Sequence, residues 1–433
     1  MDNQEWKKRD WDWHKTITKK CVAPWHSLTI EWDGLVYADA VSFSPYGSIY
    51  ENTLTELWDS PIAQSLRKSW TAGLPHKEIC ASCIKKEETV GSSRRQYFYR
   101  NIPSELLKTA TYNPFDKPNI WYLEINSSNK CNLKCRMCNG QVSSSWVKEE
   151  IQLAKITPSW MPERKTGKYS KVNFEVIKNV LEKREYFKDL QFLKLTGGEP
   201  LMEEQNYQLM EQFIEWDIAK NVMLDINTNG TYMNERLMNI AKHFKLVKLH
   251  ISLEGTGELY QYIRGGDNFT IKQLENNILE FNRLPNTVII YTVTVQIYNI
   301  FNLSDIWKWY LKIRKPTNEI YFKNVVVNPP HLNFQILPNR LKSKAYEIMK
   351  DAELPQGEYW PQDRNPNEGV FSQGDIGFGN IMKNLQSNDT YNKQRIKEFV
   401  QFTRDVDSLR KTDIKKIVPQ LAELFEEVNE ERV

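Results

Sequence analysis

The segment Cys131-Asn-Leu-Lys-Cys135-Arg-Met-Cys138 places three thiols within eight residues, directly after a short apolar stretch at 121–126. Three thiolates so close together can surround one soft metal centre. A closed zinc site needs a fourth ligand, and no histidine lies within 50 residues of this loop. The spacing therefore favours an iron–sulfur cluster that keeps one iron open for a ligand. Zinc, or cysteines that only fill a core, are the alternatives.

The stretch at 121–126 is the first of six short, apolar, β-rich segments that we expect to be strands. The others lie at 192–195, 222–226, 247–253, 288–295 and 320–327. Segments between them carry the apolar spacing of helices, at 203–217, 234–243, 271–283 and 303–313. Strands that alternate with helices predict βα units, a parallel sheet and right-handed crossovers. Six units indicate an α/β fold, either an incomplete barrel or an open doubly wound sheet.

Both flanks of this region have a different pattern. Residues 53–67 predict one short helix, with Thr53 as its N-cap and Glu56 completing a capping box. After Pro329 and Pro330 the regular alternation stops. We expect a long loop at 351–380, rich in Pro, Gly, Gln and Asn, which could fold over the barrel mouth or lie on the surface.

Two helices near 392–404 and 413–427 are expected to close the chain. The domain prediction is an N-terminal cysteine module at 1–110, a core at 118–330 and a C-terminal extension of loop and helices at 331–433.

Composition restricts the function classes. Charged residues make up 26% of the 433 residues and apolar residues 40%, which excludes wholesale disorder. The formal net charge is +3 and no block of Lys and Arg stands alone, so nucleic acid is an unlikely partner. No uncharged stretch is long enough to span a bilayer, and the first residues contain no apolar leader segment. We expect a cytoplasmic protein without a membrane partner.

A glycine-rich motif, Thr196-Gly197-Gly198-Glu199-Pro200, follows the second predicted strand. Glycines let the backbone approach a ligand closely, and a carboxylate with carbonyl oxygens suits an ammonium group. Alone the motif is weak, because Gly-Gly before a helix is often only a turn. Its position, one βα unit after the cysteines, makes it informative.

Polar residues also stand at the ends of the next two predicted strands. Asn227 and Asn229 end the third, Ser252 and Glu254 end the fourth, and Arg264 follows Ser252 by twelve residues. Carboxyl ends of parallel strands are where α/β barrels build their sites. The plainer interpretation is a turn for Asn229 and a solvated helix end for Arg264.

Together these motifs resemble the radical S-adenosylmethionine (SAM) superfamily, whose signature is Cys-x3-Cys-x2-Cys after the first barrel strand. The resemblance implies a partial (β/α)6 TIM-like barrel and a [4Fe-4S] cluster on Cys131, Cys135 and Cys138. It also implies that the Gly-Gly-Glu-Pro motif holds the SAM amino group, that Ser252 reaches the ribose and that Arg264 lies near the carboxylate. Glu254 replaces the usual Asp.

The resemblance implies reductive cleavage of SAM to methionine and a 5′-deoxyadenosyl radical, which takes a hydrogen atom from a substrate. An electron donor such as flavodoxin or ferredoxin is then required. We favour a peptide or protein side chain as substrate, ahead of a small metabolite or a nucleotide. A non-enzymatic zinc or iron–sulfur binding protein is the alternative. His250, in the fourth predicted strand, is expected to be a core or supporting residue.

The remaining cysteines, Cys21, Cys80 and Cys83, belong to an ordered series of motifs that resembles a twitch module, a short relative of the SPASM domain. The resemblance implies a second, auxiliary [4Fe-4S] cluster. Where the family usually has a cysteine pair, this chain reads Tyr37-Ala-Asp39-Ala.

We hypothesise that Asp39 is the fourth ligand. An open iron, a decayed site, or zinc with help from His76 or His26 are alternatives. If both clusters form, all six cysteines are ligands and no thiol remains to donate a hydrogen atom. Oxidation, cross-linking or rearrangement then fits better than thiol-dependent epimerisation.

Overall fold

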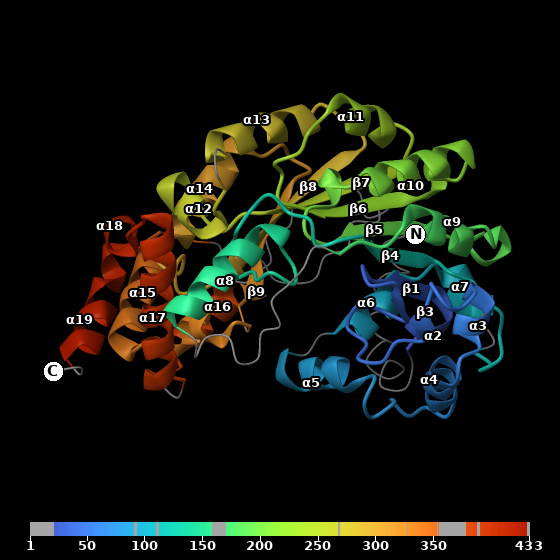
Figure 1. Ribbon diagram of the computed structural model, residues 1–433, viewed down its shortest axis with the longest axis horizontal. Coiled ribbons are helices and arrows are strands. Elements are labelled where there is room, and N and C mark those ends of the chain that lie inside the picture. The colour runs from blue at the N-terminus through green and yellow to red at the C-terminus, as the bar shows by residue number, and fades with distance from the viewer. Residues whose placement is uncertain are drawn as a thin grey trace.

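One nine-stranded sheet, in the order β3-β2-β1-β4-β5-β6-β7-β8-β9, organises the molecule (Figure 1). The structure is a computed structural model, and it describes residues 21–90, 93–109, 112–157, 170–266, 269–326, 328–352, 354, 378–387 and 390–430. In Figure 1 the sheet arches between the N-terminal module at one end and the C-terminal helices at the other.

The six predicted strands are all present, and each is parallel to its neighbours. They are β4 (Tyr122–Asn126), β5 (Phe192–Thr196), β6 (Met223–Thr228), β7 (Leu246–Ser252), β8 (Thr287–Val295) and β9 (Glu319–Val325). The chain therefore forms the predicted partial TIM-like α/β barrel, and not a doubly wound sheet with helices on both faces.

The connecting helices cover one face of this sheet (Figure 1). They include α9 (Phe174–Leu181), α10 (Glu204–Glu215), α11 (Glu235–Ala241), α12 (Gly257–Arg264), α13 (Ile271–Phe281) and α14 (Leu303–Ile313), while α8 (Val147–Ile156) follows the cysteine loop. The strand residues that face these helices are apolar, and Leu193, Leu224 and Leu249 are at most 1% exposed. Since side chains alternate along a strand, the residues between them line the inner face of the barrel.

The N-terminal module adds three short strands to the same sheet: β1 (Ser27–Ile30), β2 (Leu35–Tyr37) and β3 (Gly47–Ser48). The first of them pairs in parallel with β4, with Ile30 opposite Ile125. No sequence pattern had indicated this pairing. The barrel sheet is consequently continuous with the cysteine module.

The module's helices are α2 (Ala23–His26), α3 (Leu54–Trp58), α4 (Pro61–Thr71), α5 (Ala81–Val90), α6 (Arg94–Asn101) and α7 (Ser104–Thr109). The predicted capping box is present, because Thr53 and Glu56 bond reciprocally. The prediction of one continuous helix was wrong. The first helix ends at Trp58, and a second begins with Ser60 as its N-cap. Pro61 occupies the first position of this second helix, where a backbone N–H would have no partner within the helix.

The C-terminal extension is more helical than expected. It contains α15 (Asn339–Asp351), α16 (Phe378–Leu385), α17 (Lys393–Arg410), α18 (Ile414–Ile417) and α19 (Ala422–Glu430). The last expected helix is interrupted, and a 3-10 turn at Pro419–Leu421 separates its two parts. Most of the expected 351–380 loop, with Trp360 and Phe371, lies outside the described residues. Phe378 instead opens α16 and packs on Phe322, with ring centroids 4.3 Å apart.

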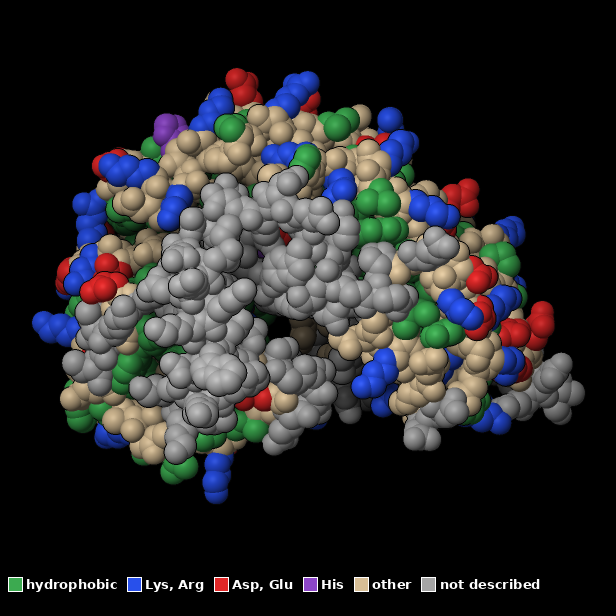
Figure 2. All heavy atoms as spheres, turned by 180° about the vertical axis from the view of Figure 1, so that it is seen from behind, with side chains coloured by type: hydrophobic (Ala, Val, Ile, Leu, Met, Phe, Trp, Pro, Cys, Tyr) green, Lys and Arg blue, Asp and Glu red, His purple; other side chains and the backbone are tan. Residues whose placement is uncertain are grey.

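The surface charges are mixed, and the described helices are not of the membrane-spanning kind. On the face shown in Figure 2, the described acidic and basic side chains are interspersed, so they create no large field of one sign. Across the described part of the chain, no helix combines the length and the apolar character needed to cross a bilayer.

Candidate active site

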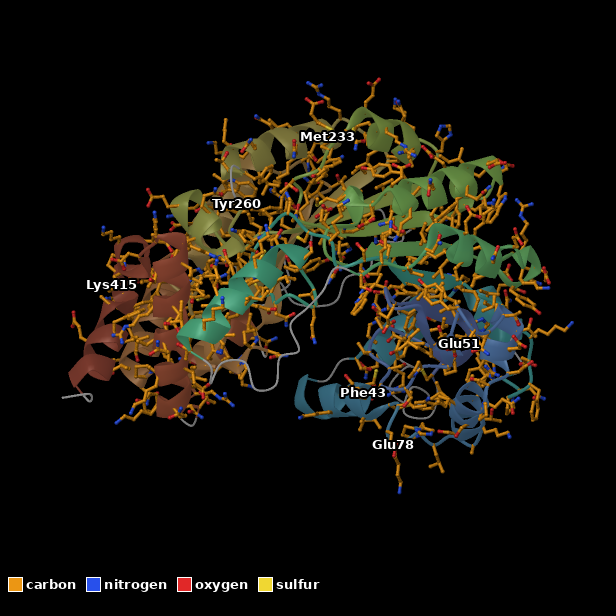
Figure 3. The ribbon with its side chains drawn as sticks, in the orientation of Figure 1. Phe43, Glu51, Glu78, Met233, Tyr260 and Lys415 are labelled. Carbon is orange, nitrogen blue, oxygen red and sulfur yellow. The ribbon has the colours of Figure 1, made fainter. Side chains whose placement is uncertain are left out.

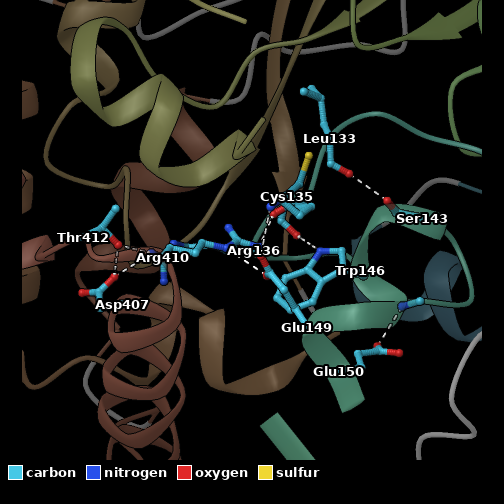
Figure 4. Close-up of polar contacts among 12 residues, drawn as sticks. Leu133, Cys135, Arg136, Ser143, Trp146, Glu149, Glu150, Asp407, Arg410 and Thr412 are labelled. Atoms are coloured by element: carbon cyan, nitrogen blue, oxygen red, sulfur yellow. Dashed lines mark hydrogen bonds and ion pairs between the residues drawn. The ribbon is translucent and has the colours of Figure 1, made fainter. Parts of the chain in front are cut away.

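The three cysteines of the central loop lie between β4 and α8. Cys131 and Cys135 are buried and Cys138 is half-buried. A tight turn closes the last two, with the Cys138 N–H donating to the Cys135 carbonyl at 2.8 Å. Figure 4 shows Trp146 beside this turn, where its indole N–H donates to the same carbonyl at 2.7 Å. The loop is therefore a fixed structure.

A donor set of three thiols in one loop suits an iron–sulfur cluster, whose irons take thiolate ligands. Across the described residues, no three His, Cys, Asp or Glu side chains converge as one shared ion requires. In a [4Fe-4S] cluster each thiolate binds a different iron, so the thiols stand apart. Burial raises the pKa of Cys131 to about 12, so a metal must displace the proton of this thiol on binding.

The glycines of the second motif explain how the end of β5 meets this loop. A Cβ on Gly197 would lie 2.4 Å from the Ser128 carbonyl oxygen, and one on Gly198 would lie 2.3 Å from that of Lys130. The backbone N–H groups of Gly198 and Glu199 donate to these same two carbonyls. Sequence reasoning had assigned the glycines to a ligand. The observed close approach is to the segment that leads into Cys131.

Glu199 is fully buried and ties two strand ends together. Its Oε1 accepts from the Thr228 hydroxyl at 2.8 Å, and its Oε2 from the Asn229 backbone N–H at 2.6 Å. Burial raises the pKa of Glu199 to about 7, although these hydrogen bonds favour its charged form. Its position at the carboxyl edge agrees with the sequence prediction. Its oxygens, however, already hold the chain that follows β6.

Asn229 links Glu199 to the cysteines. Its Nδ2 donates to the Asn132 carboxamide at 2.9 Å and lies 3.8 Å from the Cys131 sulfur. The other predicted asparagine, Asn227, is separate from this cluster of contacts. It is exposed on the inner face, where it accepts from the Lys194 ammonium group at 3.3 Å.

Three further predicted residues lie at or after strand ends, and the structure describes no hydrogen bond between them and the cysteines. Thr196 ends β5, Pro200 begins a 3-10 turn, and Ser252 ends β7 half-buried.

Arg264 and Glu254 form a buried ion pair at 2.9 Å. Arg264 lies close enough to Cys135 and Cys138 to affect the pKa of each thiol. Its Nε is buried and has no hydrogen-bond partner among the described residues. An orphaned donor next to the thiols suits an anionic ligand such as a carboxylate. Tyr260, labelled on α12 in Figure 3, lies beside the same guanidinium.

The inner face of the barrel carries charged residues that the sequence analysis did not single out. Lys194 and His250 both bind Asp225, at 2.8 and 3.2 Å, so one carboxylate joins β5, β6 and β7. Burial alone would raise the pKa of Asp225, but the His250 and Lys194 charges hold it well below its usual range. His250 is thus a half-buried polar residue of the barrel interior. Polar residues at every second position of these strands could have indicated this polar inner face from the sequence.

Glu31 extends this polar face by one strand. It follows β1, and its Oε2 accepts from Asn126 Nδ2 at 2.7 Å. Burial raises its pKa to about 7, and nearby Glu124 and Asp33 add to the effect. Among the described residues no lysine or arginine pairs with it.

The N-terminal cysteines lie along the wall of a separate pocket in the module. Cys21, Cys80, Cys83 and Asp39 line one pocket. Neither His26 nor His76 is part of this wall. His26 Nδ1 is 2.9 Å from the Asn119 carbonyl oxygen, and His76 accepts from the Ile79 N–H. The potential ligands in this wall are three thiols and one carboxylate, without the histidine on which the zinc alternative relied.

Asp39 is held in this pocket by Arg94 of α6. The Nε and Nη2 of Arg94 donate to Asp39 Oδ1 at 2.9 and 2.7 Å. The same Nη2 donates to Glu124 of β4 at 2.8 Å. One guanidinium thus contacts both the cysteine pocket and the inner face of the barrel.

Comparison with known proteins agrees with this geometry. Residues 125–307 match the family model described as the radical SAM superfamily. Residues 21–84 match the SPASM model, described as an iron-sulfur cluster-binding domain. The two matches contain the two groups of cysteines separately.

Individual relatives are distant. GTP 3',8-cyclase of Aliarcobacter butzleri (strain RM4018) is 27% identical over 135 residues, which is 31% of this chain and 34% of the cyclase. The solved structure of a histidine-tagged anSMEcpe with bound AdoMet has 16% identity and a TM-score of 0.38, covering 53% of this chain and 58% of that one.

Streptococcus suis SuiB bound to precursor peptide SuiA has 16% identity and a TM-score of 0.35, covering 67% of this chain and 59% of that one. The chain thus spans less than two thirds of the length of each of these relatives. The family matches carry the assignment. The chain thus contains a radical SAM domain at residues 125–307 and, ahead of it, an iron–sulfur cluster-binding domain of the SPASM family at residues 21–84.

Proposed function

We propose that Cys131, Cys135 and Cys138 hold the radical SAM [4Fe-4S] cluster and that the adjoining strand ends hold SAM. One observation carries this proposal: Asn229 contacts the Glu199 carboxylate through its backbone and lies 3.8 Å from the Cys131 sulfur through its side chain. The glycine motif, the end of β6 and the cysteine loop therefore meet at one point. When bound, the cluster supplies the electron that splits the SAM sulfonium and releases a 5′-deoxyadenosyl radical.

The protein's own residues have orienting roles in this scheme. The unpartnered Nε of Arg264 is placed to donate to the SAM carboxylate. The backbone around Gly198 and Glu199 supplies carbonyl oxygens for the SAM amino group, and Ser252 is assigned to the ribose. Glu254 neutralises Arg264, so the site is not left with an isolated buried cation.

The auxiliary [4Fe-4S] cluster is assigned to Cys21, Cys80 and Cys83, with Asp39 as fourth ligand. Arg94 uses only Oδ1 of Asp39, which leaves Oδ2 for an iron. This arrangement leaves no cysteine as a hydrogen-atom donor. Oxidation, cross-linking or rearrangement of the substrate is then favoured over thiol-dependent epimerisation.

We propose a polar substrate, with a peptide or protein side chain favoured over a small metabolite or a nucleotide. The support is the inner face of the barrel, where Lys194, Asp225, His250 and Glu31 offer charged and hydrogen-bonding groups. An apolar substrate would strip these groups of water without replacing their hydrogen bonds. Flavodoxin or ferredoxin is the proposed class of electron donor.

The test is anaerobic reconstitution with iron and sulfide, followed by addition of SAM and dithionite and detection of 5′-deoxyadenosine by mass spectrometry. The matched control is the triple Cys131→Ala, Cys135→Ala and Cys138→Ala variant. Product from the wild type alone supports the proposal. A wild type that loads no cluster and binds no SAM refutes it.

A further inference from the structure

The C-terminal helix α17 reaches the cysteine loop although it lies outside both matched family regions. Asp407 and Arg410, near its C-terminal end, contact the loop 271 and 276 residues away in the sequence (Figure 4). The contacted residues, Arg136 and Lys134, flank Cys135 on both sides.

Arg136 follows Cys135 in the loop and is fully buried. Its guanidinium carbon lies 3.6 Å from the centroid of the Tyr262 ring, and its Nε donates to the Tyr262 carbonyl. Its Nη2 donates to Asp407 Oδ1 at 2.6 Å. Asp407 is thus the carboxylate that neutralises a buried cation within the metal-binding loop.

Asp407 is itself rigidly placed. Its Oδ1 also accepts from the Thr412 hydroxyl at 2.7 Å, and its Oδ2 from the Ile414 N–H at 3.1 Å. These bonds fix the turn after α17, where Lys411 adopts a left-handed conformation with φ of 53°. The helix end is therefore built around the carboxylate that meets Arg136.

Arg410 makes a second, independent contact. Its Nη2 donates to the Lys134 carbonyl at 2.7 Å, and its Nε and Nη2 both donate to Glu149 of α8. Its guanidinium also lies over the Trp146 ring, 4.8 Å from the centroid. Trp146 holds the Cys135 carbonyl, so α17 secures the loop both directly and through α8.

We propose that α17 is part of the radical SAM cluster site, with Asp407 and Arg410 as positioning residues and the Arg136–Asp407 pair as its charge-compensated anchor. This inference rests on the proposed function. Without Asp407, the buried guanidinium of Arg136, the residue that follows Cys135, would have no carboxylate partner. Because reduction adds an electron to the cluster, an uncompensated neighbouring cation raises its reduction potential.

The test compares Asp407→Asn with the double variant Arg136→Met/Asp407→Leu, which removes both charges and keeps similar volume. The matched control is Arg340→Gln, since Arg340 belongs to an exposed ion pair with Glu423 in the same extension. Each protein is reconstituted in the same way. Iron and sulfide are measured, and the cluster whose electron paramagnetic resonance signal changes on addition of SAM is titrated for its midpoint potential.

We expect Asp407→Asn to load at least twofold less of the SAM-responsive cluster and to raise its midpoint potential. The double variant should return both values toward those of the wild type, and Arg340→Gln should match the wild type. Loss of folding is monitored by circular dichroism, and the double variant tests the charge even if the single variant is unstable.

Two results overturn the inference. One is an Asp407→Asn protein with wild-type cluster loading and midpoint potential. The other is a double variant whose loading and potential differ from the wild type as much as those of Asp407→Asn do. In either case a SAM-responsive cluster in the wild type would leave the proposed function standing. Absence of that cluster from the wild type would refute both.

Discussion

The guanidinium of Arg94 and the carboxylate of Asp39 meet through two hydrogen bonds, Nε and Nη2 of one to Oδ1 of the other. This contact fixes the orientation of the only carboxylate in the wall of the N-terminal cysteine pocket, as far as the described residues define it. Arg94 therefore makes no hydrogen bond to Oδ2 of Asp39.

The first prediction concerns Asp39 as a ligand. Replacing Asp39 with Ala should reduce the iron and sulfide content of the auxiliary cluster and change its absorption and paramagnetic spectra. The cluster on the central loop should be unaffected, because its cysteines belong to a separate group. Colorimetric iron and sulfide assays with spectroscopy measure this. Unchanged content and spectra would exclude Asp39 as a ligand.

The second prediction concerns stability. Arg94→Met leaves the buried carboxylates of Asp39 and Glu124 without their shared cation, which should lower the free energy of unfolding by about 3–5 kcal/mol. The control is Arg283→Met, which breaks an exposed pair with Glu280 and should cost less than about 1 kcal/mol. Urea denaturation of the metal-free proteins compares them. Equal losses for the two variants would contradict the prediction.

The third prediction concerns pH and Glu31. Its pKa rises from an ordinary 4.5 to about 7 on folding, so the folded state favours the protonated form. The contribution of this group to the free energy of unfolding is fully present below pH 4.5 and is lost as the pH rises through 7. Glu31→Gln keeps an acceptor for Asn126 and should be more stable than the wild type at pH 8, by up to about 3 kcal/mol.

Thermal unfolding midpoints at pH 5 and pH 8 measure this difference. The advantage of Glu31→Gln should shrink at the lower pH. An advantage that is the same at both pH values, or that grows at pH 5, would show that burial does not raise this pKa.

The fourth prediction concerns the glycine motif. Gly198→Ala places a methyl group 2.3 Å from the Lys130 carbonyl oxygen, so the β5 end and the cysteine loop must separate. We expect at least a tenfold loss of SAM affinity, measured by equilibrium dialysis on the reconstituted enzyme. Gly73→Ala is the control for general destabilisation, because its φ of 74° strains an added side chain while its Cβ meets nothing within 4 Å. Wild-type affinity for Gly198→Ala would contradict the prediction.

The parts of the molecule that are encoded locally could be predicted from the sequence. Apolar runs and their spacing located all six barrel strands, and the Thr53–Glu56 pair correctly marked a helix start. The break between α3 and α4 also had a local signal, the Ser60-Pro61 pair, which the interpretation of 53–67 as one helix overlooked.

Contacts between distant segments had no such signal. The pairing of β1 with β4 depends on backbone hydrogen bonds that any short extended segment could make. The Arg136–Asp407 pair joins residues 271 positions apart, and a lone arginine or aspartate in sequence does not indicate its partner. Similarly, the need for glycine at 197 and 198 becomes visible only when the neighbouring loop is in place.

The parallel pairing of β1 with β4 means that the cysteine module and the barrel are not separable units. A chain shortened to begin at residue 118 would expose β4 as a bare edge, with its backbone N–H and C=O groups free to recruit a strand from another molecule. Such a truncation should associate or aggregate. Gene fusions, domain exchanges and deletions in this enzyme therefore need to keep residues 27–30 attached to the barrel, whatever is done to the rest of the module.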